Sequence, residues 1–267
     1  MRRRPLALGL VALALAAGCG ASKTSGTQSL GTDYAAILKA SAAKTTGATS
    51  SKISLTSTTK VSGQSISLSG EGAFAYAQKE GTFDLTIAGI GGQPPTKIAE
   101  RITGGNLYLT LPGQTSFYKL SLTDLVGTSL ANSGNPTSSL STLLGVTGPV
   151  TKVGSEKIRG TSTTHYSGTV DIAKALKQLS GLTADIIKNT FSKAKVTTLP
   201  FDAYVDDQGR LRRLVQNITL AIKGEQAVVM TTVDLYDFGT KVTVEVPPAD
   251  QVKDGASLLS AFKNGAG

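Results

Sequence analysis

Few side chains in this 267-residue sequence could carry a chemical reaction. Ser41 and Lys44 have the Ser-x-x-Lys spacing of penicillin-recognising serine enzymes, in which the lysine lies beside the nucleophile. Those enzymes also need Ser-Asp-Asn and Lys-Thr-Gly elements, and neither tripeptide occurs here. His165 is the single imidazole, and without a Gly-x-Ser-x-Gly elbow it has no nucleophile to serve as a base. We therefore predict that the protein is not an enzyme.

Three carboxylates near a glycine form the one cluster that resembles a metal site. Asp202, Asp206 and Asp207 precede Gly209, but a calcium loop needs more oxygen ligands and a terminal glutamate. The Asp-Gln-Gly sequence is typical of a hairpin turn. A single Cys and a single His also exclude a Cys/His zinc site and a disulfide framework. We expect no metal and no cofactor.

The one cysteine lies where a short apolar segment ends. Arg2–Arg4 precede the apolar run Leu6–Ala17, which is shorter than the roughly 20 residues that a membrane-spanning helix needs. A charged head, a short apolar body and small residues before a cleavage point are typical of an export signal. Leu15–Cys19 resembles a bacterial lipobox, so we predict a lipoprotein signal peptide at 1–18 and lipidation, including palmitate, at Cys19. An ordinary secretory signal with an incidental cysteine is the alternative.

The charge of the mature chain argues against a nucleic-acid partner. The formal charge of +9 falls to +6 when the signal peptide removes three arginines, and the remaining basic residues are scattered. Aromatic residues make up only 5% of the chain, which is few for a protein that stacks on bases. Arg210, Arg212 and Arg213 begin a predicted strand. They could contact an anionic head group, but a solvated sheet face is the interpretation we favour.

The hydrophobic pattern predicts one domain that follows a tether. Residues 19–32 comprise the lipidated cysteine and a small, polar, flexible segment, and residues 33–267 form a single domain. Thr32 or Asp33 is expected to cap a helix from Tyr34 to about Ala43. Alternating apolar residues then predict about ten strands. Four to six helices fall between them, at Leu122–Leu130, Ser138–Leu144, Asp171–Leu179, Thr183–Ala194 and Ala249–Phe262, and the last strand is expected at Lys241–Val246.

Strands grouped around inserted helices indicate the α+β class with a large antiparallel sheet. Because alternation gives each strand a polar and an apolar side, the apolar side of the sheet has to be covered. We predict a strongly bent half-barrel sheet whose concave face the helices cover. The space beneath them is either filled with side chains or open as an apolar cavity, and the pattern alone leaves both alternatives open.

Several turn and strand sequences occur in a familiar order. Val153–Gly160 leads into Thr163–Asp171, and Tyr204–Arg213, Asp237–Gly239 and Val246–Val252 follow. Together with the lipobox, this order resembles the actinobacterial LppX/LprG-type lipoproteins, most clearly over residues 150–252. The resemblance implies a fold similar to that of the LolA and LolB lipoprotein carriers. It also implies an apolar cavity that binds acylated lipids or glycolipids and a role in moving them across the cell envelope.

Our leading hypothesis is a lipid-anchored protein on the extracytoplasmic face of the cell membrane that binds and transports lipid. Its partners would be a lipid or glycolipid, the membrane, and an envelope transporter of unknown identity. Candidate cavity-wall residues are the apolar positions of the alternating strands and inserted helices: Leu85, Ile87, Ile98, Leu107, Leu109, Leu125, Leu143, Leu144, Leu176, Ile186, Phe191, Ile218 and Val229. The alternative is a surface lipoprotein with a solid core that binds a protein or a cell-wall polymer without catalysis.

Overall fold

The structure is a computed structural model that describes residues 32–89, 91–125, 136–179, 184–185, 188, 191–192, 195–222 and 225–264. Asp33–Gly267 form one compact unit. The predicted signal peptide, Cys19, the tether up to residue 31 and Ile186 lie outside the described residues.

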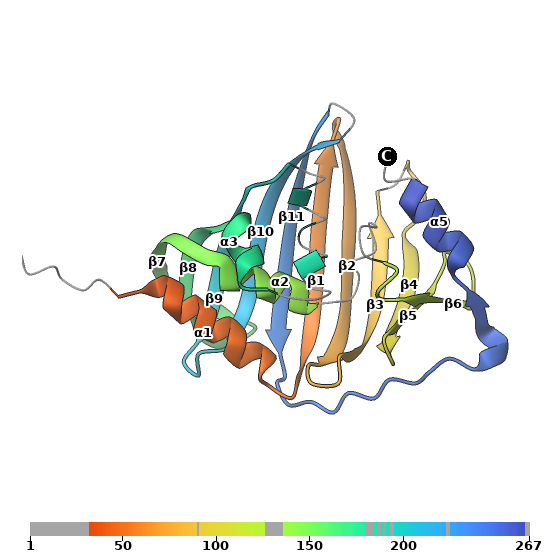
Figure 1. Ribbon diagram of the computed structural model, residues 1–267, viewed down its shortest axis with the longest axis horizontal. Coiled ribbons are helices and arrows are strands. Elements are labelled where there is room, and N and C mark those ends of the chain that lie inside the picture. The colour runs from red at the N-terminus through yellow and green to blue at the C-terminus, as the bar shows by residue number, and fades with distance from the viewer. Residues whose placement is uncertain are drawn as a thin grey trace, which may run out of the picture. The chain divides into compact units, whose positions relative to one another are not determined.

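A single twelve-stranded sheet dominates the described part of the chain (Figure 1). The strands follow the order β12-β6-β5-β4-β3-β2-β1-β11-β10-β9-β8-β7, and all neighbours are antiparallel except β12 and β6. Their bounds are β1 Ser50–Val61, β2 Gln64–Ala75, β3 Glu80–Ala88, β4 Thr96–Thr103, β5 Asn106–Thr110, β6 Phe117–Ser121, β7 Val146–Ile158, β8 Thr161–Asp171, β9 Thr198–Asp206, β10 Leu211–Ile222, β11 Glu225–Tyr236 and β12 Val252–Asp254.

The helices whose bounds the structure describes are few and short. They are α1 Tyr34–Thr46, α2 Pro136–Thr142, η1 Leu143–Gly145, α3 Ile172–Lys177, η2 Ala249–Gln251 and α5 Ala256–Asn264. Asp33, and not Thr32, caps α1, because its Oδ1 accepts a hydrogen bond from Ala36 N at 3.0 Å. Asp171 caps α3 in the same way through Lys174 N at 3.0 Å. None of the described helices is long and apolar enough to cross a membrane.

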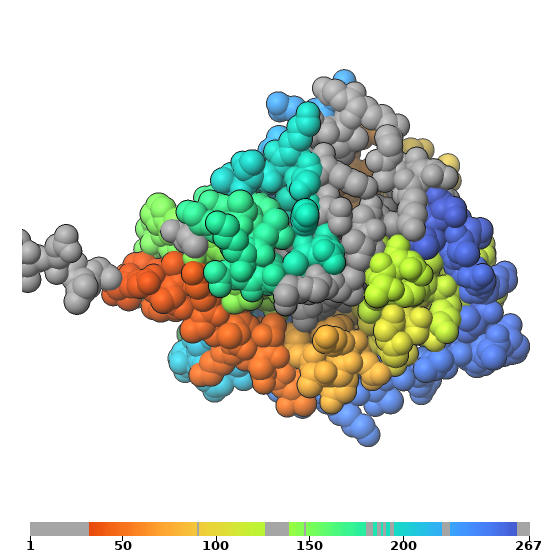
Figure 2. Space-filling model, in the orientation of Figure 1, coloured from red at the N-terminus to blue at the C-terminus, as the bar shows by residue number. Residues whose placement is uncertain are grey.

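One face of the sheet packs against helices, and we call it the covered face. It carries Ile53, Val205 and Leu214, which form one buried cluster with Leu38 and Ala42 of α1. Figure 1 shows α1, α2 and α3 on this same side of the sheet, and Figure 2 shows them from outside as a layer in front of the strands. We call the other side the opposite face. Because side chains alternate along a strand, the register of the pairs assigns each strand residue to one face or the other.

The structure corrects several of the predicted elements. The described part of the chain is mostly β, with twelve strands instead of about ten and few helices. Lys241–Val246 alternates like a strand but forms no strand, and Val246 is 58% exposed. The predicted helix Ala249–Phe262 breaks into η2, β12 and α5, because Val252–Asp254 pair with β6 instead of coiling. Leu122–Leu125 form turns, and the rest of that predicted helix lies outside the described residues. The described residues of the predicted helix Thr183–Ala194, at positions 184, 185, 188, 191 and 192, are helical as expected. The strong bend of the sheet stays a prediction.

Two glycines of β2 let neighbouring side chains lie flat on the covered face. A Cβ at Gly72 would lie 2.2 Å from the Thr82 carbonyl oxygen and 2.3 Å from Cδ1 of Phe83, and Gly70 is crowded in the same way by Leu85. The Phe83 ring therefore occupies the space above Gly72. This arrangement is a common way to recover packing where a strand has no side chain.

We expect Gly72→Ala to lower the free energy of unfolding by about 2–3 kcal/mol, because the methyl group has to displace a backbone carbonyl and a buried ring. Denaturant titration measures the change. Ser69→Ala on the exposed side of the same strand is the matched control and should change stability by less than about 0.5 kcal/mol. Equal, small effects of the two substitutions would show that the crowding at Gly72 is absent.

Candidate functional site

The seven strand positions expected to line a cavity all lie on the covered face. Leu85 pairs with Ile98, and Ile218 pairs with Val229. Val229 in turn faces Thr59 of β1, which shares its side of the strand with Ile53. The remaining three, Ile87, Leu107 and Leu109, follow at even spacing along their strands or from the pairing of Ile102 with Leu107. The register thus brings them onto one surface.

Burial divides the candidate wall residues into two groups. Leu85, Leu107, Leu109, Leu125, Leu143 and Phe191 are buried in the core cluster, with exposed fractions of 7% or less. Ile87, Ile98, Leu144, Leu176, Ile218 and Val229 are only half-buried. Ile186 lies outside the described residues. The first group therefore seals part of the covered face, while the second leaves apolar atoms open to an incoming group.

The half-buried strand side chains form a surface that we call the open surface, made of Ile66, Leu68, Ile87, Ile98, Ile218 and Val229. Rows of paired residues run across it: Val229 lies between Ile218 and Thr59, and Leu68 pairs with Ile87. The open surface thus spans β10, β11, β1, β2, β3 and β4. Such a broad aliphatic surface suits acyl chains and offers no reactive group.

The polar side chains within this region bond to one another. Ser57 Oγ lies 3.0 Å from Thr231 Oγ1, and Gln216 Nε2 donates to Thr142 Oγ1 at 3.0 Å. Gln216 projects from the sheet and Thr142 ends α2, so the second bond ties the helix to the covered face. These pairs reduce the polarity of the surface, because each group is hydrogen-bonded to its partner within the protein.

One buried carboxyl on the covered face lacks such a partner. Glu100 of β4 is 2% exposed, pairs with Phe83 and Leu109, and its Oε2 has no hydrogen-bond partner among the described residues. Burial raises the pKa of Glu100 from 4.5 to about 7. Glu100 was not among the residues predicted from the sequence. Its signal was the alternation of Ile98, Glu100 and Ile102, which places a carboxyl in the middle of an apolar stripe.

The residues considered for catalysis do not assemble a reactive site. Ser41 of α1 is buried, whereas Lys44 of the same helix is exposed. His165 Nε2 lies 2.8 Å from Asp202 Oδ1, and its ring stacks on Tyr204 with centroids 4.4 Å apart. All three lie on the opposite face of the sheet, away from the open surface. The pairing of His165 with Asp202 was not foreseen and orients the imidazole on that face.

The carboxylates near Gly209 hold a turn together. Asp206 Oδ1 accepts from Arg210 N at 2.8 Å, and its Oδ2 accepts from Arg210 Nε at 3.2 Å and Arg212 Nε at 2.8 Å. Arg213 pairs instead with Asp234, at 2.6 Å and 2.8 Å. The described residues contain no cluster of three His, Cys, Asp or Glu side chains that could hold a metal. The three arginines are therefore ion-paired along the sheet.

Substitution of Asp206 tests how much its contacts in this turn contribute to stability. Burial raises the pKa of Asp206, but the hydrogen bonds from Arg210 and Arg212 lower it by more, so it lies below its usual value. The stabilisation is therefore present above pH 4 and lost as the pH falls through that lowered value. We expect Asp206→Asn to cost about 2–3 kcal/mol of unfolding free energy at pH 7.

Asp207→Asn, at the exposed neighbouring position of the same turn, is the control and should leave stability unchanged. Thermal and denaturant unfolding at pH 7 measure both variants. If Asp206→Asn were as stable as Asp207→Asn, the arginine contacts would contribute nothing.

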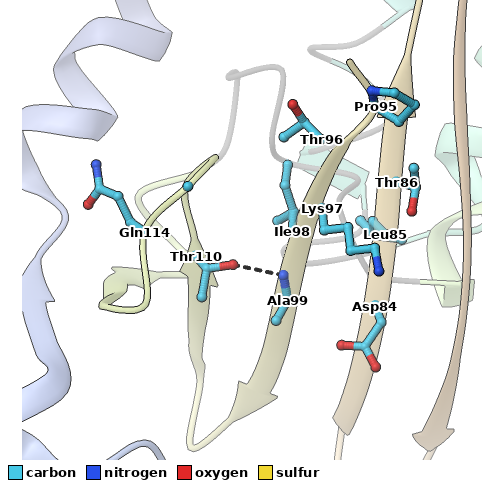
Figure 3. Close-up of a pocket in the computed structure, with 11 residues that line it drawn as sticks. Asp84, Leu85, Thr86, Pro95, Thr96, Lys97, Ile98, Ala99, Thr110 and Gln114 are labelled. Carbon is cyan, nitrogen blue, oxygen red and sulfur yellow. Dashed lines mark hydrogen bonds between the residues drawn. The ribbon is translucent and has the colours of Figure 1, made fainter.

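A pocket of about 710 Å³ adjoins β3 and β4 (Figure 3). Pairing of β4 with β5 ends at Glu100, and Thr110 Oγ1 then accepts the hydrogen bond of Ala99 N at 2.9 Å. The lining includes the charged side chains Asp84 and Lys97 together with threonines and Gln114, and reaches Leu85 and Ile98. Its mixed polarity offers no continuous apolar wall for acyl chains.

A family model described as LppX_LprAFG lipoprotein matches residues 33–244. The chain belongs to this lipoprotein family. Membership agrees with the resemblance seen in the sequence and implies a membrane-anchored protein outside the cytoplasm.

Individual relatives are more distant. An uncharacterised 31.2 kDa protein of Streptomyces griseus, from the rplA-rplJ intergenic region, is 36% identical over 120 residues, which cover 42% of this chain and 36% of that protein. The crystal structure of the lipoprotein LppX from Mycobacterium tuberculosis is similar, with a TM-score of 0.49 and 17% identity over 79% of this chain and 97% of that chain. A LolA superfamily protein from Nitrosomonas europaea has a TM-score of 0.30 and 11% identity over 80% and 94% of the two chains.

Proposed function

We propose that this lipoprotein is anchored to the membrane through Cys19, binds an acylated lipid or glycolipid on the open surface, and carries it across the cell envelope. The observation that supports the proposal is the half-buried aliphatic surface on the covered face, which spans six neighbouring strands. A solid core would bury these side chains as fully as it buries Leu107 and Leu143, which are 0% exposed.

The energetics of lipid transfer explain why such a surface is useful. A diacyl lipid carries about 30 methylenes, and each costs roughly 0.8 kcal/mol to transfer into water. Passage through an aqueous compartment therefore requires a protein that shields the acyl chains from water. Family membership supports this role, and a carrier of this kind needs no catalytic group.

The distribution of charge on the covered face agrees with an apolar ligand. Of the residues that β1, β2, β3 and β4 place on this face, Glu100 alone is ionisable. The charged side chains of these strands, such as Lys52, Asp84 and Arg101, lie on the opposite face. Acyl chains would thus meet aliphatic side chains along most of the open surface.

Extraction with organic solvent tests the proposal directly. Purified protein should release lipid in about stoichiometric amounts, identified by mass spectrometry, and the extracted protein should take up a fluorescent acyl probe. A preparation that neither yields lipid nor takes up the probe would contradict the carrier function and favour the alternative of a solid surface protein.

The anchor is tested separately. We expect Cys19→Ala to abolish incorporation of radiolabelled palmitate and to move the protein from the membrane fraction to the soluble fraction, because stable anchoring requires the acyl chains. Fractionation and labelling of the same cells measure both effects. If the variant, freed of its signal peptide, stayed with the membrane, another part of the chain would be the anchor.

A further inference from the structure

The burial of Glu100 among apolar residues lowers the stability of the fold. Glu100 lies between Ile98 and Ile102 along β4 and between Phe83 and Leu109 across the sheet, so its side chain is surrounded by apolar groups. Its Oε2 has no partner among the described residues, although more than nine-tenths of the residue is buried. Leaving a buried polar group unsatisfied costs free energy, which a leucine at the same site would avoid.

The adjacent cation, Arg101, does not neutralise it. Arg101 Nη1 donates to the backbone oxygen of Glu100 at 2.8 Å and lies 3.5 Å from Asp84 Oδ1, on the opposite face. The residues of β3 and β5 that flank the carboxyl are apolar, and on β6 Tyr118 is the titratable residue of the covered face, with its hydroxyl bonded to Gln114. The carboxyl therefore has an unused capacity to form hydrogen bonds.

Glu100 also lies at the border of the open surface. Ile98, two residues away on the same face, is half-buried, whereas Leu109 and Phe83 beside Glu100 are 3% exposed. Side chains two residues apart on a strand are separated by about 7 Å. The carboxyl is thus the next side chain that a ligand would meet if it entered the covered face beyond Ile98.

We infer that Glu100 is the polar contact of the lipid site and selects a neutral, hydroxyl-bearing lipid over one with an anionic head group. This inference rests on the proposed function, because it needs a lipid on the open surface. A protonated carboxyl both donates and accepts a hydrogen bond, as a hydroxyl does. When Glu100 is ionised, its carboxylate would repel a phosphate in the same place, because charges interact strongly in an apolar environment.

Competition against a bound fluorescent acyl probe tests the selectivity on the full delipidated chain. The probes are 1,2-dioleoylglycerol, which has one free hydroxyl, trioleoylglycerol, which has none, and dioleoyl phosphatidic acid, which is anionic. We expect the wild type to bind dioleoylglycerol at least tenfold more tightly than phosphatidic acid, and about fivefold more tightly than trioleoylglycerol.

Two variants separate the contributions of charge and hydrogen bonding. Glu100→Gln, which keeps the shape, should retain dioleoylglycerol binding and lose most of the discrimination against phosphatidic acid. Glu100→Leu should also lose the preference for dioleoylglycerol over trioleoylglycerol. Glu156→Gln, at an exposed glutamate of β7, is the control and should behave as the wild type. Circular dichroism confirms that each variant folds.

The outcomes of these measurements separate the role of Glu100 from the proposed carrier function. If the wild type binds all three lipids equally well and the Glu100 variants do the same, the role of Glu100 is wrong while the carrier function stands. If the wild type binds none of the lipids and no acyl probe, the proposed function itself fails.

Discussion

Val229→Asp should weaken binding of a fluorescent acyl probe by more than tenfold, whereas Val228→Asp should leave it unchanged. The two valines are neighbours in β11, so both substitutions make the same chemical change at almost the same place. The two side chains differ in the face of the sheet on which they lie. Val229 lies on the covered face between Ile218 and Thr59, and Val228 is 45% exposed on the opposite face.

The size of the effect follows from desolvation. An acyl chain on the open surface would cover the carboxylate of Val229→Asp, and a buried charge without a partner is strongly unfavourable. Aspartate is the informative substitution because its short side chain cannot extend to water, as lysine can by snorkelling. At Val228 the carboxylate stays in solvent, so the ligand never meets it.

Probe titration, combined with thermal unfolding of each variant, measures the effect. The unfolding data matter because Val229→Asp also loses some packing, and the comparison is valid at temperatures where both variants are folded. Should both bind the probe with wild-type affinity, the ligand would not lie across β10 and β11, and the binding surface would have to be sought elsewhere.

Alternation of apolar residues predicts the face of a side chain correctly where the strands are paired. Leu85, Ile98, Ile218 and Val229 lie on one face as their spacing requires, because side chains alternate strictly in a paired strand. Alternation failed at Lys241–Val246, which has the pattern of a strand but no neighbouring strand with which to pair. A strand needs hydrogen-bond partners, and the chain's own pattern does not reveal them.

The arginines at the start of β10 show a second limit of prediction from alternation. The register shifts between Leu211 and Arg213, so an irregularity interrupts the two-residue period there. Asp206 is then reached by Arg210 and Arg212, and Asp234 by Arg213. Asp234 is distant in sequence and belongs to a neighbouring strand. Pairings of this kind depend on the strand order, which local sequence does not determine.

Which parts of the covered face are sealed also depends on the fold. Leu109 and Ile98 have similar side chains in similar patterns, yet the first is 3% exposed and the second half-buried. The difference arises from what packs over each residue. Alternation therefore cannot predict whether the face is filled or open, and in the structure buried and half-buried apolar residues lie side by side on it.

Glu100→Gln is expected to change how the stability of the protein depends on pH. In the unfolded chain the carboxyl loses its proton near pH 4.5, whereas burial raises the pKa in the folded chain to about 7. Between these values the folded protein holds a proton that the unfolded chain has released. The free energy of unfolding therefore falls as the pH rises from 4.5 to 7, and the contribution is lost above that range.

A pKa difference of this size corresponds to about 3 kcal/mol. Relative to the wild type, Glu100→Gln should thus be more stable at pH 8 than at pH 5 by about this amount, because the amide cannot ionise. Taking the difference between wild type and variant removes the contribution of other groups, such as Asp206, which titrate in both proteins. Glu156→Gln, at an exposed site, should show no such dependence and serves as the control.

Denaturant unfolding at a series of pH values measures this difference, and repeating it with lipid bound connects stability to the binding site. A neutral hydroxyl against Glu100 would satisfy the carboxyl in its protonated form, so ligand should hold the proton to higher pH and affinity should decline above pH 7 in the wild type alone. A parallel decline in Glu100→Gln would assign the pH dependence to another group. Equal stabilities at all pH values would show that the carboxyl of Glu100 is hydrated in solution.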